Sequence, residues 1–168
     1  MKRLILIVVA LFAVMQLNAQ KVGYIATETI LSYIPQYKTA QSKLEVLNNQ
    51  YKNEIEAKYK SIEALYQKYQ ASKASLSAAE RQYKEEEIIS KEQEVKALQK
   101  KYFGQDGAMQ KKSEELLNPI KAMVSSAIEK VAKAGNYSLI IDLSAIQGVA
   151  YAKADDDLSK AVLAQLGY

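Results

Sequence analysis

The feature that most constrains this chain is a long segment, residues 36–72, that contains neither Gly nor Pro and consists mostly of good helix formers. Apolar residues recur in it at steps of three or four, or at sums of these steps, and Lys58 fills the one empty position. The average step of about 3.6 residues corresponds to one face of an α-helix. This apolar stripe consists of Leu44, Leu47, Tyr51, Ile55, Ile62, Leu65 and Tyr69. A helix about 55 Å long that is polar outside its stripe needs a partner helix along its length.

The partner helix is predicted to follow directly in the chain. Residues 71–77 form a short polar break, and Ser77 with Glu80 three positions later has the pattern of a capping box. A second helix is therefore expected from about Ala78. Its apolar residues continue the stripe at Ile88, Val95, Leu98 and Tyr102. Two long amphipathic helices joined by a short break predict an antiparallel helical hairpin.

Gly104, Gly107 and Pro119 are the three interruptions of the second helix. The apolar face keeps its phase from Leu98 to Val131, which favours one continuous helix with a bend at Pro119. Counted from the tip, the two glycines lie opposite Asn48 and Asn49 of the first helix. Two interpretations remain: Gly104 and Gly107 form a hinge in the hairpin, or they permit close packing between the helices.

The two ends of the chain have shorter elements. Residues 21–25 and 138–143 are short, apolar and β-prone, and residues 149–152 are expected to form a hairpin with the second of these strands. Thr27 is expected to cap a short helix, and Pro35 suits the first position of the long helix. Gly135 and Asn136 predict a helix end, and the acidic residues 155–157 predict the start of a last helix.

The N-terminus has the layout of a secretory signal peptide. Lys2 and Arg3 precede an apolar run over residues 4–15 and a short polar tail that ends at Ala19. The apolar run is too short for a transmembrane helix, which needs about 20 residues. We therefore expect cleavage after Ala19, export to the periplasm and no stable membrane anchor. An uncleaved anchor is the alternative, and the absence of Cys excludes a lipid-modified cysteine.

The expected fold class is α+β and mainly α, with three parts. Residues 1–19 form the signal peptide, residues 20–35 and 119–168 form a small body with a β-sheet, and residues 36–118 form a coiled-coil hairpin arm. A body of about 65 residues is marginal for an independent core, and its strands would have open edges. Pairing of edges between copies would remedy both defects, so we expect a homo-oligomer.

The composition excludes most catalytic chemistry. The chain has no His and no Cys, which removes the usual proton shuttle, thiol nucleophile and zinc ligands. We therefore predict no enzyme activity, no catalytic or metal-binding residues and no cofactor. Asp142 and residues 155–157 are the remaining acidic candidates, and helix capping explains them better. Removal of Lys2 and Arg3 lowers the excess of basic over acidic residues from four to two, too few to predict nucleic-acid binding.

The starting strand K-V-G-Y-I, the long Lys/Glu/Gln hairpin and the later S-L-I-I-D-L and V-A-Y-A segments together resemble the Skp family of periplasmic chaperones, also called OmpH-like proteins. The resemblance covers essentially the whole mature chain. It implies a homotrimer with a central β-barrel, three arms around a cavity, and ATP-independent capture of unfolded outer membrane proteins. Known members have strongly basic arms, whereas residues 36–118 here hold 15 Lys or Arg and 13 Asp or Glu.

Such a holding chaperone needs weak and numerous contacts with its clients. The chain has 12 Tyr, and a tyrosine combines an apolar ring with a polar tip. Tyr59 and Tyr66 fall beside the stripe, so we hypothesise that they contact clients; the alternative is that they pack within the hairpin. A different function class, a coiled-coil structural or adaptor protein of the cell envelope with one defined partner, also fits the arm.

Overall fold

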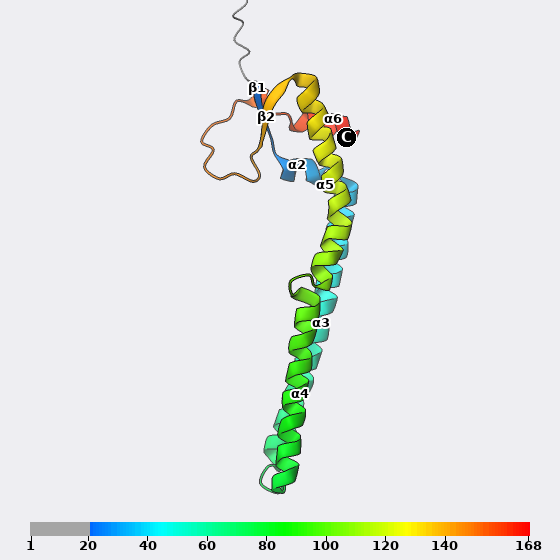
Figure 1. Ribbon diagram of the computed structural model, residues 1–168, viewed down its shortest axis with the longest axis vertical. Coiled ribbons are helices and arrows are strands. Elements are labelled where there is room, and N and C mark those ends of the chain that lie inside the picture. Colours follow the sequence, from blue (N-terminus) through cyan, green and yellow to red (C-terminus); the bar gives the residue numbers. More distant parts are fainter. Residues whose placement is uncertain (1–20) are drawn as a thin grey trace, which may run out of the picture. The chain divides into compact units, whose positions relative to one another are not determined.

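The computed structural model describes residues 21–168, and the predicted signal peptide lies outside the described residues. The elements in chain order are β1 (Lys21–Ile25), α2 (Thr27–Ser32), α3 (Pro35–Ser72), α4 (Ala78–Phe103), α5 (Ala108–Gly135), β2 (Tyr137–Asp142), a 3-10 helix η1 (Ala154–Asp156) and α6 (Ser159–Leu166) (Figure 1). The predicted fold class, mainly helical with a small sheet, is confirmed. The chain divides into two compact units. The hairpin unit is Pro35–Ala122, and the sheet unit comprises the described residues up to Ile34 together with Met123–Tyr168.

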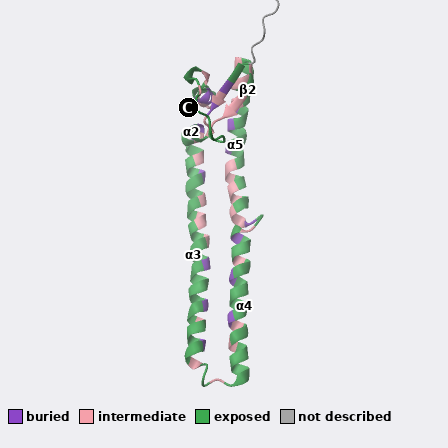
Figure 2. Cartoon of the chain, turned by 90° about the vertical axis from the view of Figure 1, so that its left-hand side faces the viewer, coloured by how far each residue is buried: buried purple, intermediate pink, exposed green. Residues whose placement is uncertain are grey.

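In the hairpin unit, α3 and α4 pack side by side, and their buried residues face each other (Figure 2). Because α4 returns after a five-residue tip, residues 73–77, the two helices are antiparallel. Six stripe residues form the buried core of this pair: Ile55, Ile62, Tyr69, Ile88, Val95 and Tyr102. Tyr51, Leu65 and Leu98 pack against that core and are half-buried, as are Leu44 and Leu47 nearer the start of α3.

The ends of the two hairpin helices follow local rules. Pro35 is the first residue of α3, where its missing N–H removes no helical hydrogen bond. The predicted capping box at the start of α4 is confirmed: Ser77 Oγ accepts from the Glu80 amide, and Glu80 Oε2 accepts from the Ser77 amide at 2.8 Å. The Ser77 hydroxyl also donates to Glu80 Oε2 at 2.7 Å, and this bond, followed by the one from the Ser77 amide, holds the pKa of Glu80 below its usual range.

The prediction of one continuous helix after the tip is wrong. Helix α4 ends at Phe103, and residues 104–107 form a loop before α5 begins at Ala108. Asp106 in this loop has a left-handed φ of 58°. Helix α3 runs through Asn48 and Asn49 without a break, so only one of the two helices is interrupted. Pro119 lies inside α5.

The sheet unit is built on two parallel strands. Val22 pairs with Leu139 and Ile25 with Asp142. Helix α2 packs against α6, and Ile30, Ile34 and Val162 are fully buried. The other buried apolar residues of this unit are Ile25, Val124, Ala127 and Leu158. Asn136, with φ of 53°, follows the last residue of α5, as the predicted helix end requires.

Three expectations for the ends of the chain need correction. Residues 149–152 form no strand, because nothing in residues 21–168 pairs with them, and Tyr151 is 82% exposed. Thr27 is the first residue of α2 rather than its cap, and its amide donates to Asp142 Oδ1 at 3.1 Å. Helix α6 begins at Ser159, after the acidic run, and Asp157 Oδ1 accepts from the Ser159 amide at 2.9 Å.

Candidate functional site

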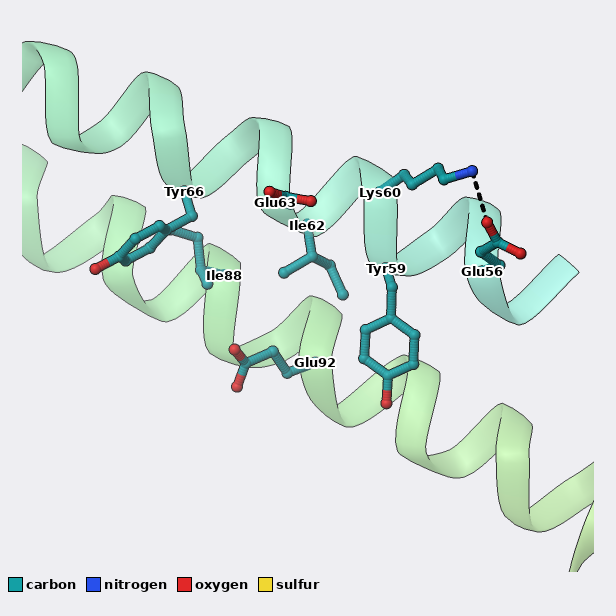
Figure 3. Close-up of a pocket in the computed structure, with 8 residues that line it drawn as sticks. All are labelled: Glu56, Tyr59, Lys60, Ile62, Glu63, Tyr66, Ile88 and Glu92. Atoms are coloured by element: carbon teal, nitrogen blue, oxygen red, sulfur yellow. Dashed lines mark ion pairs between the residues drawn. The ribbon is translucent and has the colours of Figure 1, made fainter. Parts of the chain in front are cut away.

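A groove of about 470 Å³ runs along one flank of the α3–α4 pair. Its lining residues come from both helices: Glu56, Tyr59, Lys60, Ile62, Glu63 and Tyr66 from α3, and Ile88 and Glu92 from α4 (Figure 3). Ile62 and Ile88 belong to the buried core of the pair. The groove is therefore a place where the apolar core reaches the surface beside aromatic rings.

Tyr59 and Tyr66 are the most exposed apolar side chains of this groove, at 42% and 50%. They stand seven residues apart on α3, and both rings extend toward α4 (Figure 3). The Tyr59 hydroxyl lies 3.5 Å from Gln99 Oε1, at the outer limit of a hydrogen bond. Much of both rings therefore remains in water, unlike the ring of Tyr69, which is 3% exposed in the core.

The charges around the groove are mostly negative. Lys60 Nζ lies 2.6 Å from Glu56 Oε1, and the hydrogen bond and charge of Lys60 hold the pKa of Glu56 below its usual range. The Lys60 side chain points toward Glu56, away from the tyrosine rings (Figure 3). Glu63 accepts only a 3.4 Å contact from Gln67, and within residues 21–168 no Lys or Arg forms an ion pair with Glu63 or Glu92.

The opposite flank of the same helix pair differs in its lining. Two smaller grooves, of about 80 and 190 Å³, lie there. Their charged lining residues are Lys58, Lys68, Lys84, Glu87 and Glu94. Glu87 and Glu94 are paired with Lys84 and Lys91, at 3.5 and 2.9 Å. One flank of the hairpin thus exposes tyrosines beside unpaired carboxylates, and the other exposes lysines.

An aromatic cluster lies where α4 ends. The rings of Tyr51 and Tyr102 stack with centroids 3.8 Å apart, and Phe103 meets Tyr51 edge-on at 6.2 Å. The Tyr102 hydroxyl donates to Glu54 Oε2 at 2.7 Å. This bond, together with burial, raises the pKa of the Tyr102 phenol because both favour its neutral form. The cluster therefore fixes the end of α4 on α3 just before the loop.

The two glycines predicted as a hinge both lie in the loop after this cluster. A Cβ on Gly104 would stand 2.4 Å from the Lys100 carbonyl oxygen, and one on Gly107 would stand 2.8 Å from the oxygens of Gly104 and Tyr102. The nearest atoms are thus backbone atoms of the same turn, so the alternative of close packing against α3 does not explain these glycines. Hinge motion stays a prediction.

Glu63, Ile88 and Glu92 belong to the Tyr59–Tyr66 flank without being indicated by the apolar pattern of the sequence. Ile88 is also a residue of the apolar stripe, and the two glutamates resemble the many other acidic residues of the hairpin. Counted from the tip, Glu92 lies 14 residues after the start of α4 at Ala78 and pairs with Lys58, 14 residues before the end of α3 at Ser72, which places Glu92 beside Tyr59. The register of the two antiparallel helices is therefore the signal that could have located Glu92 on this flank.

Residues 21–168 contain no group of three or more acidic side chains placed to hold a metal ion. None of the helices in that range is both long enough and apolar enough to cross a membrane. What the described residues offer is a surface for contact: exposed rings, a groove and unpaired charges.

The fold and the groove define a class of protein in which a small α+β unit is joined in one chain to a long antiparallel helical hairpin. Within that class the chain belongs to the family described as Outer membrane protein (OmpH-like), whose sequence model matches residues 21–166. The resemblance seen in the sequence is thereby confirmed.

Two curated relatives and one solved structure agree with this assignment. The chain is 27% identical over 160 residues to "Chaperone protein Skp" of Yersinia enterocolitica, covering 94% of this chain and 92% of the relative. It is 25% identical over 151 residues to "Chaperone protein Skp" of Pectobacterium atrosepticum, covering 88% and 86%. A crystal structure assigned as an OmpH-like outer membrane chaperone of Caulobacter crescentus CB15 shares the fold with a TM-score of 0.67 and 14% identity, over 89% of this chain and 85% of the other.

Proposed function

We propose that this protein is an ATP-independent holding chaperone of the periplasm that captures unfolded outer membrane proteins and prevents their aggregation. The observation that carries the proposal is the exposed Tyr59–Tyr66 pair beside a groove on a long helical hairpin. An amphipathic ring gives contact area to an unfolded chain and tolerates water when no client is present. Membership of a family whose relatives are named chaperones supports the same role.

The proposed working form is a homotrimer in which the sheet units of three copies complete each other. Eight large apolar residues of the sheet unit are exposed: Val22, Tyr33, Met123, Leu139, Ile146, Val149, Tyr151 and Tyr168. Among the described residues β2 has one ladder partner only, so its other edge is open. An open edge and exposed apolar side chains favour pairing with another chain. In the trimer the three hairpins would enclose the client cavity, with no nucleic acid and no membrane anchor required.

The test is suppression of aggregation by the chain from Gln20 onward, the form that the predicted cleavage leaves. Several unrelated β-barrel outer membrane proteins are diluted from urea without nucleotide, and light scattering is followed. Protection of all of them is expected. Protection of none would contradict the proposal and favour the adaptor with one defined partner.

Substitution of the groove tyrosines assigns the activity to a site. Tyr59→Ser/Tyr66→Ser is expected to weaken protection several-fold while molar mass and melting temperature stay unchanged. Tyr83→Ser is the control, because Tyr83 is 66% exposed and lines none of the grooves described above. If the double variant melts or dissociates, the tyrosines serve the hairpin itself and the assigned site is wrong.

A further inference from the structure

We infer that the Tyr59–Tyr66 groove selects unfolded segments in which Lys or Arg stands next to aromatic or aliphatic side chains. This inference rests on the proposed function and adds the chemical class of segment that the groove accepts. It depends on the charge of the groove, which is opposite to that of the other flank.

The first step is the apolar floor. Ile62 lies between the two tyrosines and Ile88 lies beside Tyr66, and the rings of Tyr59 and Tyr66 lie on either side of Glu92 (Figure 3). Seven helical residues place the two tyrosines about 10 Å apart along α3. An extended segment covers that distance in about three residues. The groove therefore suits a short extended stretch with apolar side chains at both ends of such a step.

The second step is the charge between the rings. The groove is lined by three carboxylates and one ammonium group, and Lys60 is already paired with Glu56. This leaves Glu63 and Glu92 without an ionic partner among the described residues. A Lys or Arg of a bound segment can meet either carboxylate, and its cation can also lie over a tyrosine ring. An acidic segment would meet repulsion at the same place.

The third step is the contrast with the opposite flank. There Glu87 and Glu94 are neutralised by neighbouring lysines, and Lys58 and Lys68 also line the grooves. The preference for basic segments therefore belongs to the Tyr59–Tyr66 flank and does not follow from the net charge of the hairpin, which is slightly positive over residues 36–118.

The test uses three fluorescein-labelled peptides built from repeats of Phe-Ser-X-Phe-Gly, with X as Arg, Gln or Glu. Binding to the chain from Gln20 onward is measured by fluorescence anisotropy in dilute buffer. Exposed ion pairs at two carboxylates predict that the Arg peptide binds about three- to tenfold more tightly than the Gln peptide, and the Glu peptide more weakly. At 0.5 M NaCl the difference should fall below about twofold because salt screens exposed charges.

Two double variants with the same change in net charge locate the effect. Glu63→Gln/Glu92→Gln should remove the preference for Arg, so that the Arg and Gln peptides bind this variant with equal affinity. Glu87→Gln/Glu94→Gln, on the opposite flank, should retain the preference. An equal loss in both double variants, or tighter binding of the Glu peptide, would overturn the inference.

The remaining outcomes separate this inference from the proposed function. If the Gln peptide binds through Tyr59 and Tyr66 but Arg adds nothing, the inference fails alone. If no peptide binds, both fail. If Glu63→Gln/Glu92→Gln changes the molar mass of the assembly, the groove is a contact between copies of this chain, and the inference is again wrong.

Discussion

The hairpin unit and the sheet unit bury their apolar residues in different ways. In the hairpin unit the buried residues Ile55, Ile62 and Tyr69 of α3 meet buried residues of α4 through a repeating stripe. In the sheet unit the core joins segments from both ends of the chain, and Leu139 and Tyr151 remain exposed. The comparison teaches that the hairpin needs only its own two helices, whereas the sheet unit is incomplete in one chain.

The largest expected effect is in the sheet unit, from Ile30→Ala. Ile30 is fully buried, and removal of its side chain should cost about 2–5 kcal/mol of unfolding free energy. For a unit this small that loss is comparable to its whole stability, so hydrogen exchange should show the sheet unit open and the hairpin protected. Ile89→Ala, at a 52% exposed site of α4, is the control and should change little. Simultaneous loss of protection in both units would contradict the claim that the hairpin is stabilised by its own two helices.

In the hairpin, Val95→Ala should destabilise by about 2 kcal/mol through lost burial and a cavity. Val46→Ala removes the same atoms from a residue that is 67% exposed, against 2% for Val95, and should stay within about 0.5 kcal/mol. Urea unfolding followed by circular dichroism measures both. Equal effects of the two variants would show that the stripe does not hold the hairpin together.

Gly107→Ala tests the loop that interrupts the hairpin. A Cβ there would collide with backbone oxygens of Gly104 and Tyr102, so a loss of about 1–2 kcal/mol is expected. Gln105→Ala, at an exposed loop position, is the matched control.

Amides of residues 104–109 should exchange faster than those of the flanking turns if the loop is a hinge. Equal exchange rates in residues 104–109 and in the flanking turns would contradict the hinge prediction.

Ser77→Ala should cost about 1 kcal/mol, because the start of α4 loses the hydroxyl that accepts from Glu80. Ser90→Ala, in the exposed middle of α4, should be neutral or slightly stabilising, since Ala is the better helix former. The melting temperatures of both variants, measured by thermal unfolding, test this prediction. An unchanged melting temperature for Ser77→Ala would mean that the tip fixes the hairpin without the capping box.

The smallest expected effect is pH dependence in the sheet unit. Burial of the Asp142 carboxylate opposes its ionisation, but hydrogen bonds from Thr27 and Ser144 outweigh burial and hold its pKa below the usual range. The stabilisation is therefore complete above the unfolded pKa of about 3.9 and is lost as the pH falls through the lower folded pKa. Asp142→Asn should remove this part of the acid sensitivity in denaturant titrations between pH 2 and 6. An unchanged acid profile would contradict it.

The hairpin could be predicted from the sequence because its determinants are local. A period of 3.6, the residue types and the Ser77–Glu80 spacing each act within a few positions. The loop at residues 104–107 was missed because Tyr102 and Met109 are seven residues apart, so a short loop that returns to the same face preserves the apolar phase that was used to exclude it. A preserved apolar phase therefore excludes a long loop, but it does not exclude a short loop that returns to the same helix face.

The sheet unit was less predictable because its contacts join distant positions. The acceptor for the Thr27 amide is Asp142, 115 residues away, so the local expectation that Thr27 caps its own helix could not detect it. Residues 149–152 have strand-forming side chains, but none of the other described segments pairs with them. Pairing partners of this kind are set by tertiary contacts. For residues 149–152 we propose that another copy of the chain supplies the partner strand.

The molar mass of the chain from Gln20 onward, measured by light scattering at micromolar concentration, tests most directly whether the sheet unit is completed by other copies. Our account predicts three chain masses, with no stably folded monomer on dilution. A folded monomer with the sheet unit protected from hydrogen exchange would contradict it.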